Sequence, residues 1–308
     1  MTIQQLEYIL AVNRQRHFVK AAEECHVSQP TLSAMIQKLE EELDVKIFDR
    51  SKHPVEPTSI GASIIAQAQT TLNDLNRVRE LVETKINTLS GSLNIGIIPT
   101  VAPYLIPQFI SKFSKSFPDV HLRISEMRNN ALIEDLQCSG LDMAIMTTPL
   151  NNSQLLEIPL YYEKFVAYVS PSCHLKDNNL KASAMPEEDL WVLQESQCIL
   201  HGRQEFNFCK SKIANHLYEA GSIDTLVRIV DQNGGYTVIP EMHVKFLTDQ
   251  QKNNLREITN PEVSREISLV IRHDYIKERM LNAVADTVKK IIPDNMIDAR
   301  LKKFAIKI

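Results

Sequence analysis

The stretch "AAEECHVSQPTLSAMIQKLEEELDVKIFDR", residues 21–50, decides how the N-terminal part of the chain folds. Its start favours a short helix with a small-residue face, since Ala21 and Ala22 let a second helix approach closely. Ser28 then suits a helix N-cap, and Pro30 suits the first turn, where its missing N–H costs nothing. Apolar residues of this second helix recur at helical spacing, at Leu32, Ile36, Leu39 and Leu43. Two helices joined by a tight turn, the second with one buried face, predict a helix-turn-helix.

The other face of the second helix carries short, mostly uncharged polar side chains. Its residues are Gln29, Thr31, Ser33, Ala34, Gln37 and Lys38. Such groups suit base edges in a DNA major groove better than they suit a purely solvated face. The following stretch, "KIFDRSKHPVEPT" at 46–58, carries Arg50 and Lys52 and predicts a β-wing that reaches phosphates or a minor groove. The alternative is a small helical bundle with a charged loop.

Charge limits how this part of the chain can hold DNA. The whole chain of 308 residues has a net charge of −4, so a basic signature for nucleic acid is absent and any such site must be local. Residues 1–58 carry seven basic and nine acidic side chains, which is a net charge of −2. Since phosphate contacts supply most non-specific affinity, one copy should bind DNA weakly. Affinity must come from several copies acting together.

Residues 59–90 supply a means of association. Apolar residues recur there at three- and four-residue steps, at Ile64, Ala68, Leu75, Val78, Val82, Ile86 and Leu89. This spacing predicts a helix of about 30 residues, about 45 Å long. An exposed helix with an apolar seam needs a partner, so we expect a homodimer through it, although it could instead pack on its own chain. A dimer presents two reading helices to double-stranded DNA with dyad-symmetric half-sites.

Residues 91–308 alternate strand and helix patterns, which is typical of an α/β domain with parallel sheets. Strands are expected at 93–98, 120–127, 141–147, 163–170, 190–193, 235–240 and 266–272. Helices are expected at 103–117, 130–139, 205–220, 223–233 and 275–292. The number of elements suits two subdomains, the first at about 91–161 and 266–308 and the second at about 162–265. Ligand sites then lie at the carboxyl ends of the strands.

The "IIPT" turn places Thr100 at such a strand end, just before a helix. Backbone donors and a hydroxyl there would receive a small polar or anionic effector, or Thr100 merely caps the helix. No Gly-rich phosphate loop, nucleophile elbow or acid–base pair can be assembled, so an enzyme is the weaker hypothesis. We expect no cofactor and no bound metal.

The N-terminal "MTIQQLEYILAV" lacks a basic start and a long apolar region, which argues against a secretion signal. The uncharged stretch 91–111 contains three prolines and does not suit a membrane span. We therefore expect a cytoplasmic protein without a membrane partner. Structural disulfides are rare in that compartment, so its cysteines are free thiols by default. They are Cys25, Cys138, Cys173, Cys198 and Cys209.

The stretch "SQCILHGRQEFNFCK" at 196–210 allows three roles for Cys198 and Cys209. A zinc site would add His201 and His216, but their spacing matches no common finger. Buried, inert thiols are the second possibility. The third is a redox pair, which needs Cα atoms about 4.4–6.8 Å apart, whereas one continuous helix would separate them by about 16 Å. Oxidation would then refold the segment, and closing such a loop is worth roughly 3 kcal/mol.

The order and spacing of the motifs in 21–50 resemble the N-terminal signature of LysR-type transcriptional regulators: paired alanines, V-S-Q-P, L-S, L-E-x-x-L and F-x-R. "GLDMAI" and "GGYTVIP" further along are similar to phrases of that family's effector domain, so the resemblance covers the whole chain. It implies a winged helix-turn-helix at 1–58, a linker helix at 59–90 and a periplasmic-binding-protein-like effector domain of two subdomains at 91–308. It also implies a homodimer or homotetramer that works with RNA polymerase. The residues that it places on DNA are Gln29, Pro30, Thr31, Ser33 and Ala34, with Arg50 on a phosphate.

Within this family, the cysteine pair resembles that of the peroxide-sensing OxyR branch, which follows a strand similar to "LWVLQESQC". The resemblance implies that hydrogen peroxide oxidises Cys198 to a sulfenic acid, which Cys209 then resolves to a disulfide. It also implies that Thr100 lies beside the peroxide and that Arg265 lowers the pKa of the first thiol.

Two positions depart from that branch. Gln197 stands where a histidine precedes the first cysteine, and Asn129 stands where a second threonine is usual. The competing expectation is therefore a regulator of the same family that senses a small-molecule effector between its subdomains, with cysteines that do not sense.

Overall fold

The computed structural model describes residues 1–52, 54–83, 89–181, 185–193, 198–201, 204–207, 216–218, 222–259, 262–273, 275, 277–303 and 305–306. The chain divides into an N-terminal unit, Met1–Asn87, and a C-terminal unit, Thr88–Ile308. Among the described residues, no helix is both long and apolar enough to cross a membrane.

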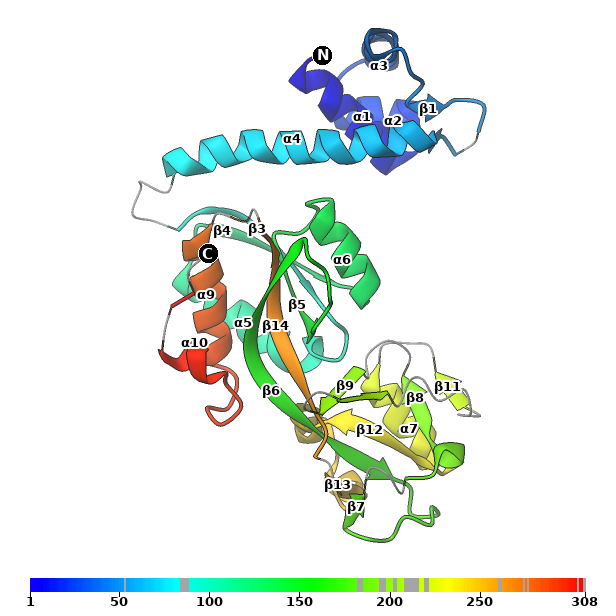
Figure 1. Ribbon diagram of the computed structural model, residues 1–308, viewed down its shortest axis with the longest axis vertical. Helices are drawn as coiled ribbons and strands as arrows, with labels where there is room; N and C mark the ends of the chain where they lie inside the picture. Colours follow the sequence, from blue (N-terminus) through cyan, green and yellow to red (C-terminus); the bar gives the residue numbers. More distant parts are fainter. Residues whose placement is uncertain are drawn as a thin grey trace. The chain divides into compact units, whose positions relative to one another are not determined.

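The N-terminal unit is helical, with a two-stranded wing (Figure 1). Its elements are α1 (Ile3–Gln15), α2 (Phe18–Glu24), α3 (Gln29–Leu43), β1 (Phe48–Asp49), β2 (Glu56–Pro57) and α4 (Ser59–Glu83). The α3 helix begins as its sequence predicts, because the Ser28 side chain accepts a hydrogen bond from the Thr31 N–H at 3.3 Å and Pro30 lies in the first turn. The wing strands pair antiparallel, with Phe48 opposite Pro57.

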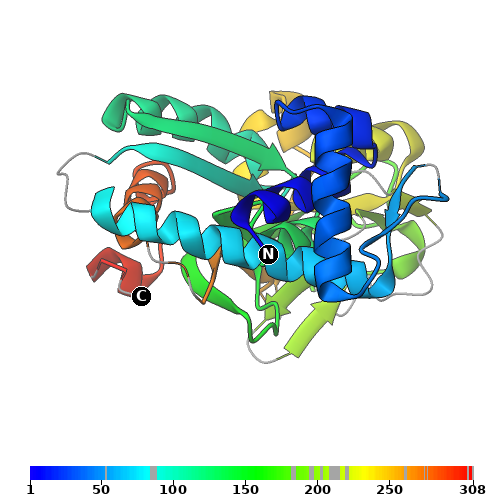
Figure 2. The ribbon, with the colours of Figure 1, turned by 90° about the horizontal axis from the view of Figure 1, so that it is seen from above.

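The core of this unit comes from one face of each helix. Leu32, Ile36 and Leu39 of α3 are fully buried, as expected, but Leu43 is 37% exposed. The expectation for Leu43 is wrong because α3 ends there, and Asp44 turns the chain away in a left-handed conformation. The 25-residue α4 is one unbroken helix (Figure 2). Its first turns pack on the unit's own core through Ile65 and Ala68, so the alternative of packing on its own chain holds for that part.

The C-terminal unit is an α/β structure built around a ten-stranded sheet. The strands of the unit are β3 (Gly91–Ile97), β4 (Val120–Glu126), β5 (Met143–Thr148), β6 (Leu155–Val169), β7 (Asn179–Lys181), β8 (Trp191–Leu193), β9 (Cys198–His201), β10 (Gln204–Asn207), β11 (His216–Tyr218), β12 (Tyr236–Pro240), β13 (Leu255–Thr259) and β14 (Ser264–Arg272). Of these, β8 and β11 form a separate two-stranded sheet. The helices of the unit are α5 (Ala102–Ser116), α6 (Asn129–Gln137), α7 (Ile223–Asn233), α8 (Asp249–Lys252), α9 (Glu278–Lys289) and α10 (Ala299–Lys303), with 3₁₀ turns η2 (Glu187–Asp189) and η3 (Glu241–Phe246).

The sheet is mixed rather than parallel. Its longest path is β4-β3-β5-β14-β6-β13-β7, in which β3 pairs parallel with β4 and β5, whereas β14 pairs antiparallel with β5 and β6. The expectation of purely parallel sheets is wrong because β6 and β14 are long antiparallel partners. Figure 1 shows them running together from the half of the unit with α5 and α9 to the half with β12 and β13. The chain thus crosses between the halves along β6 and returns along β14.

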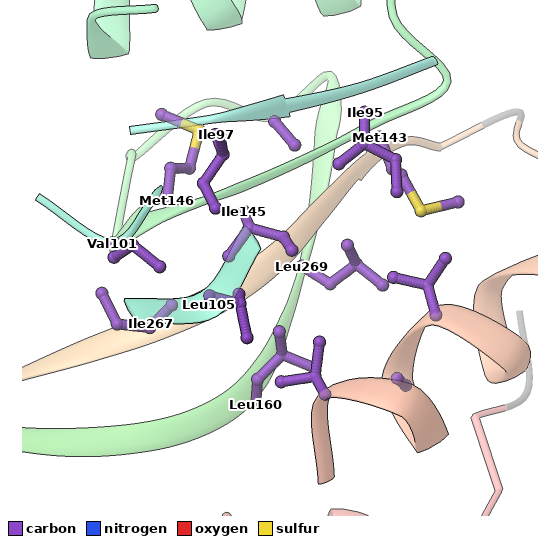
Figure 3. Packing of buried hydrophobic residues seen from close by; sticks show 14 of the residues in the cluster. Ile95, Ile97, Val101, Leu105, Met143, Ile145, Met146, Leu160, Ile267 and Leu269 are labelled. Atoms are coloured by element: carbon purple, nitrogen blue, oxygen red, sulfur yellow. The ribbon is translucent and has the colours of Figure 1, made fainter. Parts of the chain in front are cut away.

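Each half has its own core. In the first half, Ile145 of β5 lies beside Leu105 of α5 (Figure 3). The same buried cluster includes Ile95, Leu160 and Leu269. In the second half, two smaller clusters form around β12 and α7. Residues 223–233 form the expected helix, capped by the Ser222 side chain, which accepts from the Thr225 N–H.

The helix expected at 205–220 is wrong where the structure describes that stretch. Residues 204–207 form β10, which pairs antiparallel with β9 so that Asn207 lies opposite Cys198. Residues 216–218 form β11, which pairs parallel with β8. In "EFNF" polar and apolar residues alternate, which fits a strand once a neighbouring strand supplies the hydrogen bonds.

Candidate functional site

The first candidate site is the outer face of α3. Its predicted DNA-reading residues share one side of the helix, opposite the buried Leu32, Ile36 and Leu39. The exposed ones are Gln29, Pro30, Thr31, Ala34 and Lys38. The structure therefore presents a short-chained polar surface that a base edge can approach without obstruction from bulky side chains of the same helix.

Ser33 is the half-buried member of this face, and it positions Arg50. Arg50 Nη1 donates a hydrogen bond to Ser33 Oγ at 3.1 Å, and its guanidinium lies 5.0 Å from the centre of the Phe18 ring. Nη2 also reaches Glu40 Oε2 at 3.4 Å. The Arg50 side chain remains 39% exposed, so its charge is held beside α3 yet is open to a partner.

Glu40 is a buried residue of this site that the sequence reasoning missed. Its side chain is 1% exposed, and Oε1 accepts hydrogen bonds from the backbone N–H groups of Ile47 (2.8 Å) and Phe48 (3.2 Å). These bonds fix the chain where it enters the wing, while Oε2 holds Arg50. A signal was present: Glu40 stands four residues after Ile36, on the apolar face of α3, where an acidic residue needs partners.

Lys52, in the loop of the wing, forms an ion pair with Glu56 at 2.5 Å. Both side chains are about half exposed, so the pair is screened by solvent and leaves Lys52 only partly neutralised. Within the described wing, the charge of Lys52 is therefore partly offset by Glu56.

The second candidate site lies where β6 and β14 cross between the halves of the C-terminal unit. Arg265 of β14 donates from Nη1 to Thr100 Oγ1 at 2.7 Å, although the two residues are far apart in the sequence. Both are buried, at 1% and 2% exposed. The N-cap of α5 is Val101 and no side chain caps that helix, so the alternative role of Thr100 as a helix cap is wrong.

Glu163 is the partner of Arg265, and the sequence reasoning missed it. The two residues are direct cross-strand neighbours, and Arg265 Nε and Nη2 donate to Glu163 Oε2 at 2.9 and 2.8 Å. Both side chains are fully buried. Burial lowers the pKa of the Arg265 guanidinium, but the charge and hydrogen bonds of Glu163 together with the two nearby tyrosines raise it, and the net shift of the pKa is upward. The available signal was a carboxylate inside an otherwise largely apolar strand, which required a buried cation.

Two tyrosines complete what we call the Arg265 network (Arg265, Glu163, Thr100, Tyr104, Tyr161). The hydroxyls of Tyr104 and Tyr161 lie 2.6 Å apart, and Tyr104 donates to Glu163 Oε2 at 3.1 Å. Burial, and then the charge of Glu163, raises the pKa of both phenols well above the ordinary value, so they stay protonated donors. The Met242 N–H of η3 donates to Glu163 Oε1 at 3.2 Å.

The remaining predicted pocket residues are less directly described. Asn129 is the half-buried first residue of α6, and the hydrogen bonds of the Arg265 network given above do not include it. Gln197 and Cys209 lie outside the described residues.

Cys198 is the first residue of β9, and β9 runs along the start of β14. Leu200 of β9 pairs with Ser264, the residue before Arg265. The pairing of β5 with β14 ends at Thr148, opposite Glu266, and β9 pairs with β14 just beyond that point. The backbone of Cys198 therefore belongs to the strand that lies beside Arg265 at the crossover. The resemblance to the OxyR branch also places Cys198 and Arg265 in one site.

The thiols of Cys25 and Cys138 are poor nucleophiles. Burial raises the pKa of both, and at Cys138 the charge of Asp135 adds to the shift. A raised pKa lowers the thiolate fraction on which reactivity depends. Cys173 is a buried member of a hydrophobic cluster. These three cysteines therefore have the surroundings of inert thiols.

Comparisons with known proteins cover both units. Residues 3–62 match the model of the "bacterial regulatory helix-turn-helix protein, lysR family", and residues 87–291 match the "LysR substrate binding domain". The chain is 33% identical to the hydrogen peroxide-inducible genes activator of Haemophilus influenzae, over 95% of this chain and 99% of that protein. It is 32% identical to the DNA-binding transcriptional dual regulator OxyR of Escherichia coli K12, over 88% and 90%.

Solved structures agree with these sequence matches. A full-length OxyR variant from Pseudomonas aeruginosa is similar with a TM-score of 0.79 and 28% identity, over 97% of this chain and 98% of that one. A hydrogen peroxide-bound OxyR variant from Corynebacterium glutamicum is similar with a TM-score of 0.57 and 26% identity, over 94% and 92%.

Proposed function

Because this chain belongs to the LysR family of DNA-binding transcriptional regulators, we propose that it responds to hydrogen peroxide through Cys198 and Cys209. The observation that carries the proposal is the position of β9, whose first residue is Cys198, beside Arg265 at the crossover. The relatives named as hydrogen peroxide-inducible activators supply the oxidant class.

The reaction consumes one peroxide and two thiols. The thiolate of Cys198 attacks one peroxide oxygen, the O–O bond breaks, and the departing hydroxide takes a proton to become water. The thiol of Cys209 then attacks the sulfur of the Cys198 sulfenic acid, and a second water leaves as the disulfide forms. Peroxide is reduced by two electrons, and the two cysteines are oxidised by two.

Thr100 and Arg265 form the described part of the pocket, and Gln197 and Asn129 complete it in our proposal. Arg265 orients the Thr100 hydroxyl, since Nη1 donates to it at 2.7 Å and leaves its proton free to point elsewhere. A hydroxyl held in this way suits a small, polar, uncharged ligand that both donates and accepts hydrogen bonds.

We further propose that the α3 face reads bases while Arg50 and Lys52 contact phosphates. The negative net charge of residues 1–58 supports binding by a homodimer or homotetramer to dyad-symmetric half-sites, since one copy has few phosphate contacts to offer. The boundaries 1–58, 59–90 and 91–308 are proposed for the reading domain, the linker and the effector domain, with subdomains joined by β6 and β14. Contact with RNA polymerase and a cytoplasmic location belong to the same proposal, which assigns no catalytic turnover to the chain.

The test is stoichiometric oxidation of the purified full-length protein by hydrogen peroxide. We expect peptide mapping to find a Cys198–Cys209 disulfide, and footprinting to show altered contacts on DNA. Cys198→Ser should abolish both changes, whereas the matched control Cys138→Ser, at an exposed thiol, should abolish neither. Finding both thiols free after oxidation, or an unchanged footprint once the disulfide has formed, would contradict the proposal.

One observation favours the second candidate, a small-molecule effector with non-sensing cysteines. Thr147 Oγ1 is buried and has no hydrogen-bond partner among the described residues. Thr147 pairs with Ile267 across β5 and β14, so its side chain lies on the same sheet face as Arg265. An unpaired hydroxyl there suits a bound ligand. Native mass spectrometry of the purified protein would reveal a retained metabolite, and none should be found if peroxide is the signal.

A further inference from the structure

We infer that Glu163 is a specificity-determining residue: it makes the pocket beside Arg265 electrically neutral, so that the pocket admits an uncharged effector and excludes anionic ones. This inference deepens the proposed function and rests on it, because it names the charge class of the signal that the same pocket accepts.

Arg265 would otherwise be the natural anchor for an anionic effector. A guanidinium presents its donors as a planar fork that matches a carboxylate in two places. In this chain the fork formed by Nε and Nη2 is already occupied by Glu163 Oε2, at 2.9 and 2.8 Å. The third nitrogen, Nη1, is used by Thr100. Nη2 also approaches the Thr100 carbonyl oxygen, at 3.5 Å. An anion that bound the fork of Nε and Nη2 in two places would therefore have to displace Glu163.

Displacement is opposed because Glu163 is held from three sides. Besides Arg265, its carboxylate accepts from Tyr104 OH of α5 and from the Met242 N–H of η3. The side chain is fully buried, so a displaced carboxylate would lose all of these donors while staying out of water. Leaving a buried charge without its partner is far more costly than losing an exposed one.

A second cation, Lys245, lies next to the Arg265 network. Lys245 Nζ is 5.4 Å from the centre of the Tyr104 ring and 5.2 Å from that of Phe246. The charge that acts on Lys245 is that of Glu163 itself, and Glu241 lies on the same 3₁₀ turn as Lys245. Burial lowers the pKa of Lys245 and raises that of Glu241, so burial favours the neutral form of both side chains on η3. The side chains of η3 therefore add no strong net charge next to the neutral pair of Arg265 and Glu163.

The experiment removes the internal carboxylate and asks whether a free one takes its place. Full-length Glu163→Ala, with both thiols kept reduced, is titrated with sodium acetate at constant ionic strength while its melting temperature is followed. Acetamide, which has the same shape without the charge, is titrated in parallel. We expect a saturable rise of about 3 °C or more with acetate and none with acetamide, and no acetate-specific rise for the wild type.

Two further variants make the result specific. Glu163→Ala/Arg265→Met should show no acetate response, because the cation is gone. Glu262→Ala should show none either, because its exposed pair with Lys164 at 3.0 Å leaves no buried cation behind. If Glu163→Ala does not fold, its refolding yield with acetate and with acetamide is compared, and the yield should rise only with acetate.

Two outcomes would overturn the inference. One is an acetate response in the wild type as large as in Glu163→Ala. The other is no acetate response in Glu163→Ala, in melting or in refolding. Since neither readout involves a cysteine, a failure here leaves the peptide mapping of Cys198 and Cys209 untouched, and a failure of peroxide sensing leaves the acetate titration interpretable.

Discussion

The two units each hold an arginine on a buried glutamate, and they do so to different degrees. In the N-terminal unit, Arg50 touches Glu40 at 3.4 Å and keeps 39% of its side chain exposed. In the C-terminal unit, Arg265 is fully buried and donates two hydrogen bonds to Glu163. Both glutamates also accept backbone N–H groups, so both fix the chain as well as the arginine.

The difference shows which arginine can serve an external partner. Arg50 makes a long contact with Glu40 and its side chain is partly exposed, so a phosphate could approach it without disrupting the core. The hold on Arg265 is complete, and any ligand that needs its charge must first remove Glu163. A buried pair of this kind orients its neighbours and excludes competitors, whereas a half-exposed pair presents a charge.

The largest effect is expected from breaking the buried pair. Arg265→Ala leaves the carboxylate of Glu163 buried without its cation, so the free energy of unfolding should fall by about 3–5 kcal/mol. Urea unfolding followed by circular dichroism measures this. Glu163→Leu/Arg265→Met removes both charges and should recover most of the loss. A loss below about 1 kcal/mol for Arg265→Ala would show that the pair is more solvated than its burial implies.

In the N-terminal unit the same kind of deletion should cost less. Glu40→Ala leaves the N–H groups of Ile47 and Phe48 buried without an acceptor, which should lower the free energy of unfolding by about 2–4 kcal/mol. Glu40→Gln keeps an acceptor oxygen for them and should cost less. Equal losses for the two variants would mean that the charge near Arg50, and not the backbone contact, is what Glu40 contributes.

Acid should act on the C-terminal unit through His243. Its side chain is 1% exposed, and burial lowers its pKa, although the nearby Asp224, at 3.2 Å from Nε2, opposes the shift. Below the unfolded pKa of about 6.5 the unfolded chain takes up the proton first, so stability falls as the pH falls. For this one proton the slope can be at most about 1.4 kcal/mol per pH unit, and it should shrink in His243→Gln.

The pH dependence of stability that comes from a buried histidine is expected for the C-terminal unit, because the described histidines of the N-terminal unit, His17 and His26, are exposed. Urea unfolding at pH values between about 5 and 8 checks it, with probes placed in each unit. If His243→Gln keeps the full slope in the C-terminal unit, the acid sensitivity belongs to other groups.

A smaller effect, on DNA affinity, is expected from a change on the predicted DNA-binding surface. Arg50→Ala should weaken binding to all sequences and reduce the slope of log affinity against log salt by about 0.9 for each reading helix engaged. Lys46→Ala is the matched control, because Lys46 shares the partner Glu40 at 3.7 Å but is 71% exposed. Fluorescence anisotropy at several salt concentrations measures both. An unchanged slope for Arg50→Ala would remove Arg50 from the phosphate contacts.

The smallest effect belongs to a fully solvated pair. Lys164 and Glu262 lie 3.0 Å apart with more than half of each side chain exposed. Glu262→Ala should change the free energy of unfolding by less than about 0.5 kcal/mol, since water and salt screen such pairs. A larger loss would indicate that Lys164, the residue after Glu163, supports the Arg265 network.

Local signals predicted most of the helices correctly. Ser28 and Ser222 cap helices that begin where the sequence indicates, because a hydroxyl that accepts an N–H from the first turn is a strictly local interaction. The helix predicted at 205–220 is wrong at the residues that the structure describes there, 205–207 and 216–218, for the complementary reason. The partner of β10 is β9, and strand pairing depends on a neighbour that local periodicity does not report.

The candidate sites divide in the same way. The α3 face could be predicted because helical spacing alone separates Gln29, Thr31 and Ala34 from the buried leucines. Thr100 and Arg265 were predicted from a resemblance, and the structure brings them within 2.7 Å. Glu40 and Glu163 were missed, since a carboxylate in a sequence is assigned to solvent until its partners are known.

By itself, the sequence determined the helix-turn-helix, the α/β class of the remainder and the exposed polar face of α3, because each depends on spacing within one segment. Only the tertiary structure decided which charges are buried together. Residues 100, 163 and 265 become neighbours because β6 and β14 pair side by side and α5 packs against them. That long-range pairing is what turns a positive charge that looked available to a ligand into one that is already neutralised.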